Sequence, residues 1–272
     1  MNRKAMFGAA VLIAFALLAL VGPLLVGDPG EPVDVPLLPP SAHHLLGTTG
    51  QGQDVLAQTI AGARSSLAIG IITGFLVVAL GALVGTTAAF FGGWVNELLG
   101  LGINLFLLMP GLPLMVVIAA YLPPSAARTV FVLVFAGWAW SARVIRAQAL
   151  SIRQRDFIAA AIVAGERPLR VIAVEMLPNM TSLLASAFIG SVIYAIGAQV
   201  GLEFLGLGDP NRVTWGTNLY WAANDSALLT GSWWTFVPTG TCVALVGFAL
   251  AMVNQGIDEL GNPRLRGQRA AG

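Results

Sequence analysis

The stretch DFIAAAIVAGERPLRVIAVEMLPN, residues 156–179, is a polar interruption between two long apolar runs, and it decides how the chain is organised. Its alanines and aliphatic residues favour helix. Gly165 suits a helix C-terminus, where φ can become positive, and Pro168 suits a first helical turn. Pro178 disfavours helical geometry in the residue before it. The stretch therefore predicts two short helices joined at Gly165, the second running over residues 168–177 and ending at Pro178.

This pair of helices is predicted to lie outside the lipid bilayer, at the mouth of two membrane spans. Arg167, Arg170 and Glu175 keep one side of the second helix in water, while its aliphatic residues can face the membrane or another protein. An exposed helix-turn-helix that connects two spans is suited to docking a partner.

The composition indicates an all-α integral membrane protein. The 272 residues are 57% hydrophobic and only 10% charged, with a mean hydropathy of +0.81, whereas soluble domains carry about 25% charged residues. A formal charge of +1 gives no indication of a nucleic-acid partner, and membrane lipid is the expected surroundings. The single cysteine, Cys242, excludes an intrachain disulfide and a cysteine metal site.

Apolar runs predict six transmembrane helices with the docking loop, residues 147–179, between spans 4 and 5. The runs cover residues 5–27, 65–96, 98–127, 129–142, 176–202 and 226–256. The resulting organisation is an N-terminal transmembrane helix over 1–27, an extracytoplasmic segment over 28–64, a five-helix core over 65–260 with a second extracytoplasmic segment at 203–232, and a tail over 261–272. The first run is too long for a signal peptide and has no A-x-A-like cleavage site, so it is interpreted as an uncleaved span.

The basic residues predict the orientation of these spans. With both termini in the cytoplasm, only Arg64, Arg128 and Arg212 of the fourteen basic residues lie outside, as the positive-inside rule requires. The loop over 147–179 then faces the cytoplasm. Trp221, Trp233 and Trp234 are predicted to form an aromatic belt near the outer end of the last span.

A few polar or helix-breaking residues inside the spans are candidates for a translocation path. Prolines at 110 and 113 must kink or unwind the third span, which fits a cavity wall or a simple packing kink. The candidate path residues are Asn104, Met109, Pro110 and Gln199. Glu203 is interpreted as an interfacial carboxylate, with proton handling as the alternative. His43 and His44 are interpreted as a solvated loop pair, because a metal site needs further ligands.

Three collinear blocks resemble the membrane subunits of ABC importers. Ala160-Ala161, Gly165 and Met176-Leu177-Pro178 resemble the cytoplasmic "EAA" loop of that family. The block HHLLGTTGQGQDVLAQTIAGARSSL, residues 43–67, is similar to a segment of peptide and nickel permeases, and GLEFLGLGDPNRVTWG, residues 201–216, is similar to another. Ala159 replaces the usual glutamate of the loop, Glu175 a common histidine, and Gln53 an arginine.

The resemblance implies a permease subunit of the dipeptide/oligopeptide/nickel branch, similar to its C-type subunit, in the bacterial cytoplasmic membrane. It implies a second homologous permease subunit, two ATPase subunits that bind ATP and Mg, and an extracytoplasmic substrate-binding protein. In the loop, Gly165 would form the turn, Phe157 and Ile158 would insert into an ATPase cleft, and Asp156 and Arg167 would contact its edge. The external face, which would meet the binding protein and the second permease, would include Gly47, Asp54, Phe204 and Trp215.

The residues also argue for an external source of energy. The chain has no Gly-x-x-x-x-Gly-Lys-Ser/Thr phosphate loop, so neither ATP binding nor enzymatic activity is expected of it. Its spans lack the charged relay of a proton-driven carrier. A membrane enzyme would need reactive groups at one depth, and a passive channel would not need the helix pair. Peptides, nickel or another small solute stay open as substrates.

Overall fold

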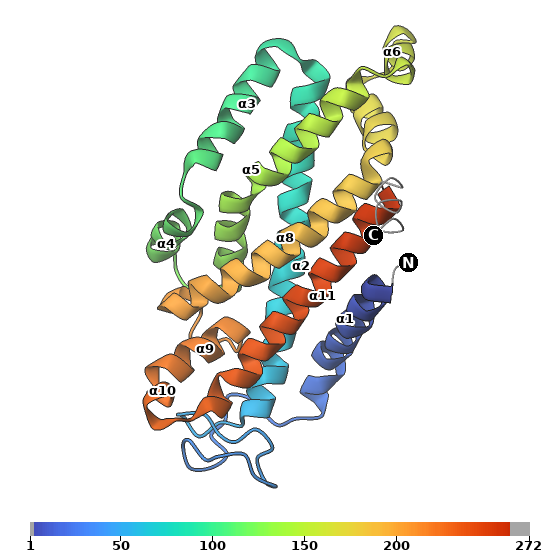
Figure 1. Ribbon diagram of the computed structural model, residues 1–272. Helices are drawn as coiled ribbons and strands as arrows, with labels where there is room; N and C mark the ends of the chain where they lie inside the picture. The colour runs from blue at the N-terminus through green and yellow to red at the C-terminus, as the bar shows by residue number, and fades with distance from the viewer. Residues whose placement is uncertain (1–2, 262–272) are drawn as a thin grey trace, which may run out of the picture.

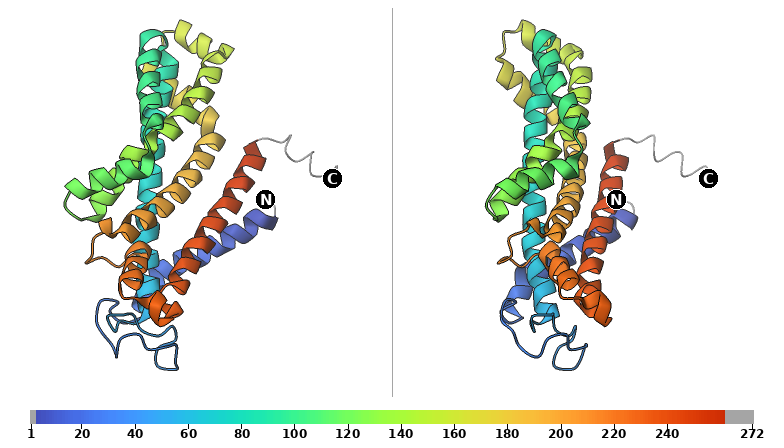
Figure 2. Two further views of the ribbon diagram at one scale, coloured as in Figure 1. Left: turned by 60° about the vertical axis from the view of Figure 1, so that its left-hand side comes forward. Right: turned by 90° about the vertical axis from the view of Figure 1, so that its left-hand side faces the viewer.

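The computed structural model describes residues 3–261, in which every regular element is helical apart from two isolated β-bridges. Five helical segments are long and apolar enough to cross a membrane, and a bent pair makes up to six. The helices lie side by side in a tilted bundle, with the coil of residues 28–54 at one end and α6 at the other (Figures 1 and 2). The predicted all-α architecture is therefore confirmed. Of the predicted tail over 261–272, residues 262–272 lie outside the described residues.

The first and last long helices pack against each other. α1 (Arg3–Val21), extended by the 3-10 turn η1 (Gly22–Leu24), runs alongside α11 (Val237–Gly261) (Figure 1). Gly8 allows the close approach, because a Cβ there would lie 2.7 Å from the Ala249 carbonyl oxygen. The hydrophobic effect between helices is weak in lipid. Small residues at such contacts let the helices pack closely, and van der Waals packing then holds them together.

The central helix is α2 (Val55–Phe91), which at ~1.5 Å per residue is about 55 Å long. It begins ten residues before the predicted start of the second span at residue 65. Asp54 caps its N-terminus, accepting hydrogen bonds from the backbone N–H groups of Leu56 at 2.8 Å and Ala57 at 3.0 Å. The extracytoplasmic segment predicted over 28–64 is therefore coil only to residue 54, because this cap sets the helix start.

Glycines of α2 allow this helix to pack closely against two neighbours, α5 (Ala126–Arg153) and α8 (Thr181–Leu202). A Cβ on Gly74 would lie 2.6 Å from Val192 of α8, and one on Gly85 would lie 2.8 Å from the Ala142 carbonyl oxygen of α5. The close backbone approach makes these three helices the centre of the bundle.

Gly85→Leu is expected to destabilise the bundle by about 1–3 kcal/mol or more, because the new side chain meets backbone atoms that cannot move aside. The measurement is the thermal midpoint for loss of the monodisperse peak of the chain in detergent. Gly102→Leu in α3 is the matched control, because nothing lies within 4 Å of a Cβ there. Equal midpoints for the two variants would contradict the assigned α2–α5 contact.

The predicted third span is unwound at residues 109–110, which is one of the two outcomes expected of its prolines. α3 (Gly93–Leu108) and α4 (Gly111–Tyr121) meet at 88°. Met109 and Pro110 are extended, with ψ of 134° and 110°, because Pro110 cannot donate to a continuing helix. Buried Arg128 fixes the far end of α4 by donating to the carbonyl oxygens of Ala119 and Leu122 at 3.2 and 3.1 Å.

Short elements join the last two long helices at the end of the bundle that carries residues 28–54. They are the π-helical turn η4 (Glu203–Leu207), α9 (Trp215–Asn224), α10 (Ala227–Thr230) and η5 (Trp233–Thr235). Gly231 adopts a positive φ of 72° between the last two, so the final long helix starts later than the predicted residue 226. The predicted segment over 203–232 is thus mostly helical.

Candidate functional site

The helix α6 (Asp156–Val163) projects from the end of α5 (Figure 1). Asp156 stands in its first turn, where a carboxylate is favoured by the helix dipole. Its C-terminus forms a Schellman motif: Gly165 N–H donates to the Ile162 carbonyl at 3.0 Å, and Glu166 N–H donates to the Ala161 carbonyl at 3.1 Å. Gly165 has a φ of +79°, as predicted for the turn.

The returning arm consists of short helical elements of three kinds, with a boundary at Pro178. A single helical turn, α7 (Pro168–Arg170), passes into the π-helical turn η2 (Val171–Met176), the 3-10 turn η3 (Pro178–Met180) and then α8. Leu177 keeps helical angles and donates to the Ile172 carbonyl at 2.9 Å. The π-helical turn therefore ends just before Pro178, as expected, and Pro178 stands in the first turn of a separate 3-10 element that leads into α8.

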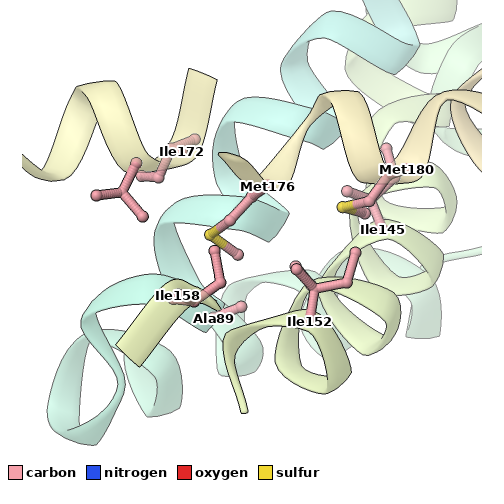
Figure 3. Close-up of a cluster of buried hydrophobic side chains, with 9 residues drawn as sticks. Ala89, Ile145, Ile152, Ile158, Ile172, Met176 and Met180 are labelled. Carbon is pink, nitrogen blue, oxygen red and sulfur yellow. The ribbon is translucent and has the colours of Figure 1, made fainter. Parts of the chain in front are cut away.

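One side of α6 is part of the interior of the chain. Ile158 is fully buried, and Figure 3 shows it pointing toward Met176 of the returning arm and Ala89 of α2. Ile152 of α5 belongs to the same cluster. The side chain of Ile158 packs against α2, α5 and the returning arm. The predicted insertion of Ile158 into a partner is therefore wrong, because this side chain is already buried within the chain.

Several apolar side chains of the α6 hairpin (residues 156–170) are exposed. Val163 is 88% exposed, Leu169 is 80% exposed and Phe157 is 42% exposed. Ala160 is also exposed, and Ala161 is half-buried. A projecting surface of this kind is typical of a protein contact, and we call Phe157, Val163 and Leu169 the apolar tip.

Charged groups surround the apolar tip. Asp156 and Arg167 are exposed, as a role at the edge of a contact requires. Arg170 pairs with Glu166 one turn earlier at 3.2 Å on the exposed surface. These groups keep the hairpin soluble and leave the tip as its apolar contact area.

Two arginines of α5, the helix that leads into the hairpin, form polar contacts with neighbouring helices. Arg146 of α5 donates through Nε to Asn96 Oδ1 of α3 at 2.8 Å, and Arg153 donates through Nε to the Phe90 carbonyl of α2 at 3.2 Å. The Arg153 guanidinium also lies over the Phe90 ring, 5.6 Å from its centroid. These contacts join α5, which leads into the hairpin, to α2 and α3.

The predicted path residues do not come together. Gln199 is fully buried and donates to the Glu203 carboxylate at 3.2 Å, while Asn104, Met109 and Pro110 are exposed on and after α3. A hollow of about 470 Å³ lies elsewhere, along α5 and α8. Its polar lining comes from Ser141, Ser186, Ser191, Tyr194 and Asn254.

The predicted external face is partly interior. Trp215 is fully buried and donates from its indole to the Thr59 carbonyl at 3.1 Å, which holds α9 against α2. Gly47 is buried with a positive φ of 72°, and a Cβ there would lie 2.4 Å from the Leu38 carbonyl oxygen. Asp54 is the α2 cap, whereas Phe204 is 48% exposed and can be contacted. The predicted interfacial Glu203 is only 3% exposed.

Sequence reasoning missed Val163 and Leu169. Their spacing about the Gly165 turn was an available signal, because residues that flank a tight turn on both sides lie at its tip. The local sequence does not distinguish the buried face of α6 from its exposed face, because Phe157 and Ile158 are adjacent and both apolar.

Comparison with known proteins defines the class. Residues 78–266 match the family "binding-protein-dependent transport system inner membrane component", and the chain belongs to that family. The oligopeptide transport system permease protein OppC of Mycobacterium tuberculosis is 32% identical over 98% of this chain and 93% of the relative. The dipeptide transport system permease protein DppC of Bacillus subtilis is 29% identical over 97% of this chain and 83% of the relative. The chain thus aligns with these relatives over nearly its whole length.

Proposed function

We propose that this chain is the membrane-spanning permease subunit of an ATP-driven importer of dipeptides or oligopeptides. The observation that carries the proposal is the α6 hairpin, with its exposed apolar tip on a base packed against α2 and α5. The names of the relatives support peptides as the substrate class. Nickel is the alternative within the same branch.

The partners follow from this role. Two ATPase subunits, which would bind ATP and Mg, receive the hairpin of this chain and that of a second, similar permease subunit. A substrate-binding protein delivers the cargo on the other side. The orientation that suits this assembly places α6 and both termini in the cytoplasm and residues 28–54 outside, in the bacterial cytoplasmic membrane.

The proposed mechanism moves α5 and α8 as a unit with α6. The hairpin leaves α5 at Arg153, and its returning arm enters α8 directly through the 3-10 turn η3. Closure of the ATPases on ATP would shift α6, and the two long helices would tilt with it. Both helices line the hollow of about 470 Å³, so a change in their tilt changes its width.

This hollow is the proposed contribution of the chain to the translocation path. Hydroxyl groups supply much of its polarity, and the Ser141 and Ser191 hydroxyls lie 3.3 Å apart at its wall. A wall lined by neutral hydroxyl groups can form hydrogen bonds with a peptide. It has no charged group that would retain peptides of one charge more tightly than others. This replaces the path predicted from Asn104, Met109, Pro110 and Gln199.

The test is recovery of the tagged chain from its native host in mild detergent, followed by identification of the proteins that stay bound. The proposal expects a second six-span permease and ATPases with phosphate-binding loops. Uptake of labelled peptides and of nickel by cells that lack the chain then identifies the cargo. Recovery of the chain alone in several detergents would favour a channel or a membrane enzyme.

A further inference from the structure

A histidine lies between two carboxylates at the end of the bundle that carries residues 28–54. His44 Nδ1 is 3.0 Å from Asp54 Oδ2, and His44 Nε2 is 3.4 Å from Asp34 Oδ2. The side chain of His44 is only 13% exposed. The predicted solvated pair of histidines is therefore wrong for His44, although His43 is exposed.

The geometry selects the charged form of this ring. A neutral imidazole has one N–H donor and one lone pair, whereas ionised carboxylates only accept hydrogen bonds. In the neutral ring one nitrogen lone pair would face a carboxylate oxygen without a proton between them. Only the imidazolium can donate from Nδ1 to Asp54 and also present an N–H to Asp34, whose contact at 3.4 Å is an ion pair.

The two carboxylates belong to different parts of the fold. Asp54 uses its other oxygen, Oδ1, to cap α2. Asp34 lies in the coil near Val33, whose N–H donates to the Gly52 carbonyl at 2.8 Å. The imidazolium thus connects the first half of the coil to the start of the central helix. A nearby hydrogen bond from the Trp234 indole to the Thr48 carbonyl, at 3.2 Å, involves no titratable group and therefore does not respond to pH.

We propose that His44 is a pH-operated clasp: as an imidazolium it holds residues 28–54 against the start of α2 through Asp34 and Asp54, and it loosens them when it loses its proton. The clasp is a property of this chain and does not depend on the transport role proposed above. Its position means that the surface presented by the coil would differ between acidic and alkaline surroundings.

The direction of the pH dependence follows from the same contacts. The hydrogen bond to Asp54, supported by Asp34, raises the pKa of His44 above its ordinary value of 6.5, and desolvation opposes this effect. Asp34 and Asp54 are the charged groups that act on it in the described part of the chain. A raised pKa means that the clasp is fully formed below pH 6.5 and is lost as the pH rises through the raised value.

Amide hydrogen exchange of the purified complex between pH 5.5 and 8.5 tests the clasp, with rates corrected for intrinsic exchange. We expect the protection factors of peptides covering residues 30–54 to fall as the pH rises. Each unit by which the pKa is raised corresponds to about a tenfold change in the opening equilibrium. His44→Gln should show low protection at every pH, and His43→Gln, which changes the only other histidine, should follow the wild type.

A second variant keeps the test decisive if His44→Gln disturbs folding. Asp34→Asn removes one carboxylate and leaves the α2 cap intact, so protection should fall at a lower pH than in the wild type. A wild-type profile that does not change with pH, or that is matched by His44→Gln, would overturn the proposal. Loss of bound ATPases would bear only on the proposed function, because the exchange measurement needs no transport.

Discussion

Gly165→Trp is expected to reduce coupled substrate uptake about tenfold or more, equivalent to ~1.4 kcal/mol in docking, while the chain still inserts in the membrane. Nothing lies within 4 Å of a Cβ at Gly165, so the indole has room in the free chain. Bulk at this turn interferes only when the hairpin enters a partner. ATP hydrolysis by the complex should continue without driving uptake.

The control for this variant is Gly165→Ala. It imposes the same strain at a φ of +79°, costing about 1–2 kcal/mol, but adds little volume. Uptake and ATP hydrolysis are measured for both variants in reconstituted vesicles. Normal uptake by the tryptophan variant, or an equal loss in the alanine variant, would remove the argument that the turn fits a cleft.

Ile158→Ala is expected to lower the stability of the chain by about 2–5 kcal/mol, because it leaves a cavity in a fully buried cluster. Val163→Ser, on the opposite side of the same helix, should change the stability by less than about 0.5 kcal/mol, since Val163 is 88% exposed. The serine variant should instead lose bound ATPase. Thermal unfolding of the detergent-purified chain and ATPase co-purification separate the two effects.

The reverse pattern would contradict the assignment of the two faces of α6. If Ile158→Ala kept the wild-type midpoint but lost the ATPase, the inner face would be the docking face. The two variants therefore test which apolar side chains of the hairpin pack within the chain and which contact the ATPase.

Local features of the sequence predicted what local chemistry determines. The helix over Asp156–Val163, the glycine turn after it and the break at Pro110 all depend on residues within one or two helical turns. Hydropathy alone gave the all-α class and the spans. The apolar run begins at residue 65, but α2 begins ten residues earlier because Asp54 caps its N-terminus.

The features that the sequence did not predict depend on partners far along the chain. Ile158 is buried because Met176 returns over it, and Trp215 is buried because its indole meets the Thr59 carbonyl. His44 lies beside Asp34 because the coil folds back on itself. The π-helical geometry of Val171–Met176, which ends just before Pro178, has no signal in the composition of the sequence.

Site-specific crosslinking from the apolar tip is the most direct test of the central claim, that the α6 hairpin docks an ATPase. In a Cys242→Ser background the chain has no native cysteine, and Val163→Cys then places one thiol at the tip. Leu24→Cys is the control, because Leu24 is 82% exposed, close to the 88% of Val163, but belongs to η1 at the other end of the bundle. The account predicts a covalent adduct with an ATPase subunit from position 163 and none from position 24. An adduct from position 24, or none from position 163 in an assembled, ATP-hydrolysing complex, would contradict it.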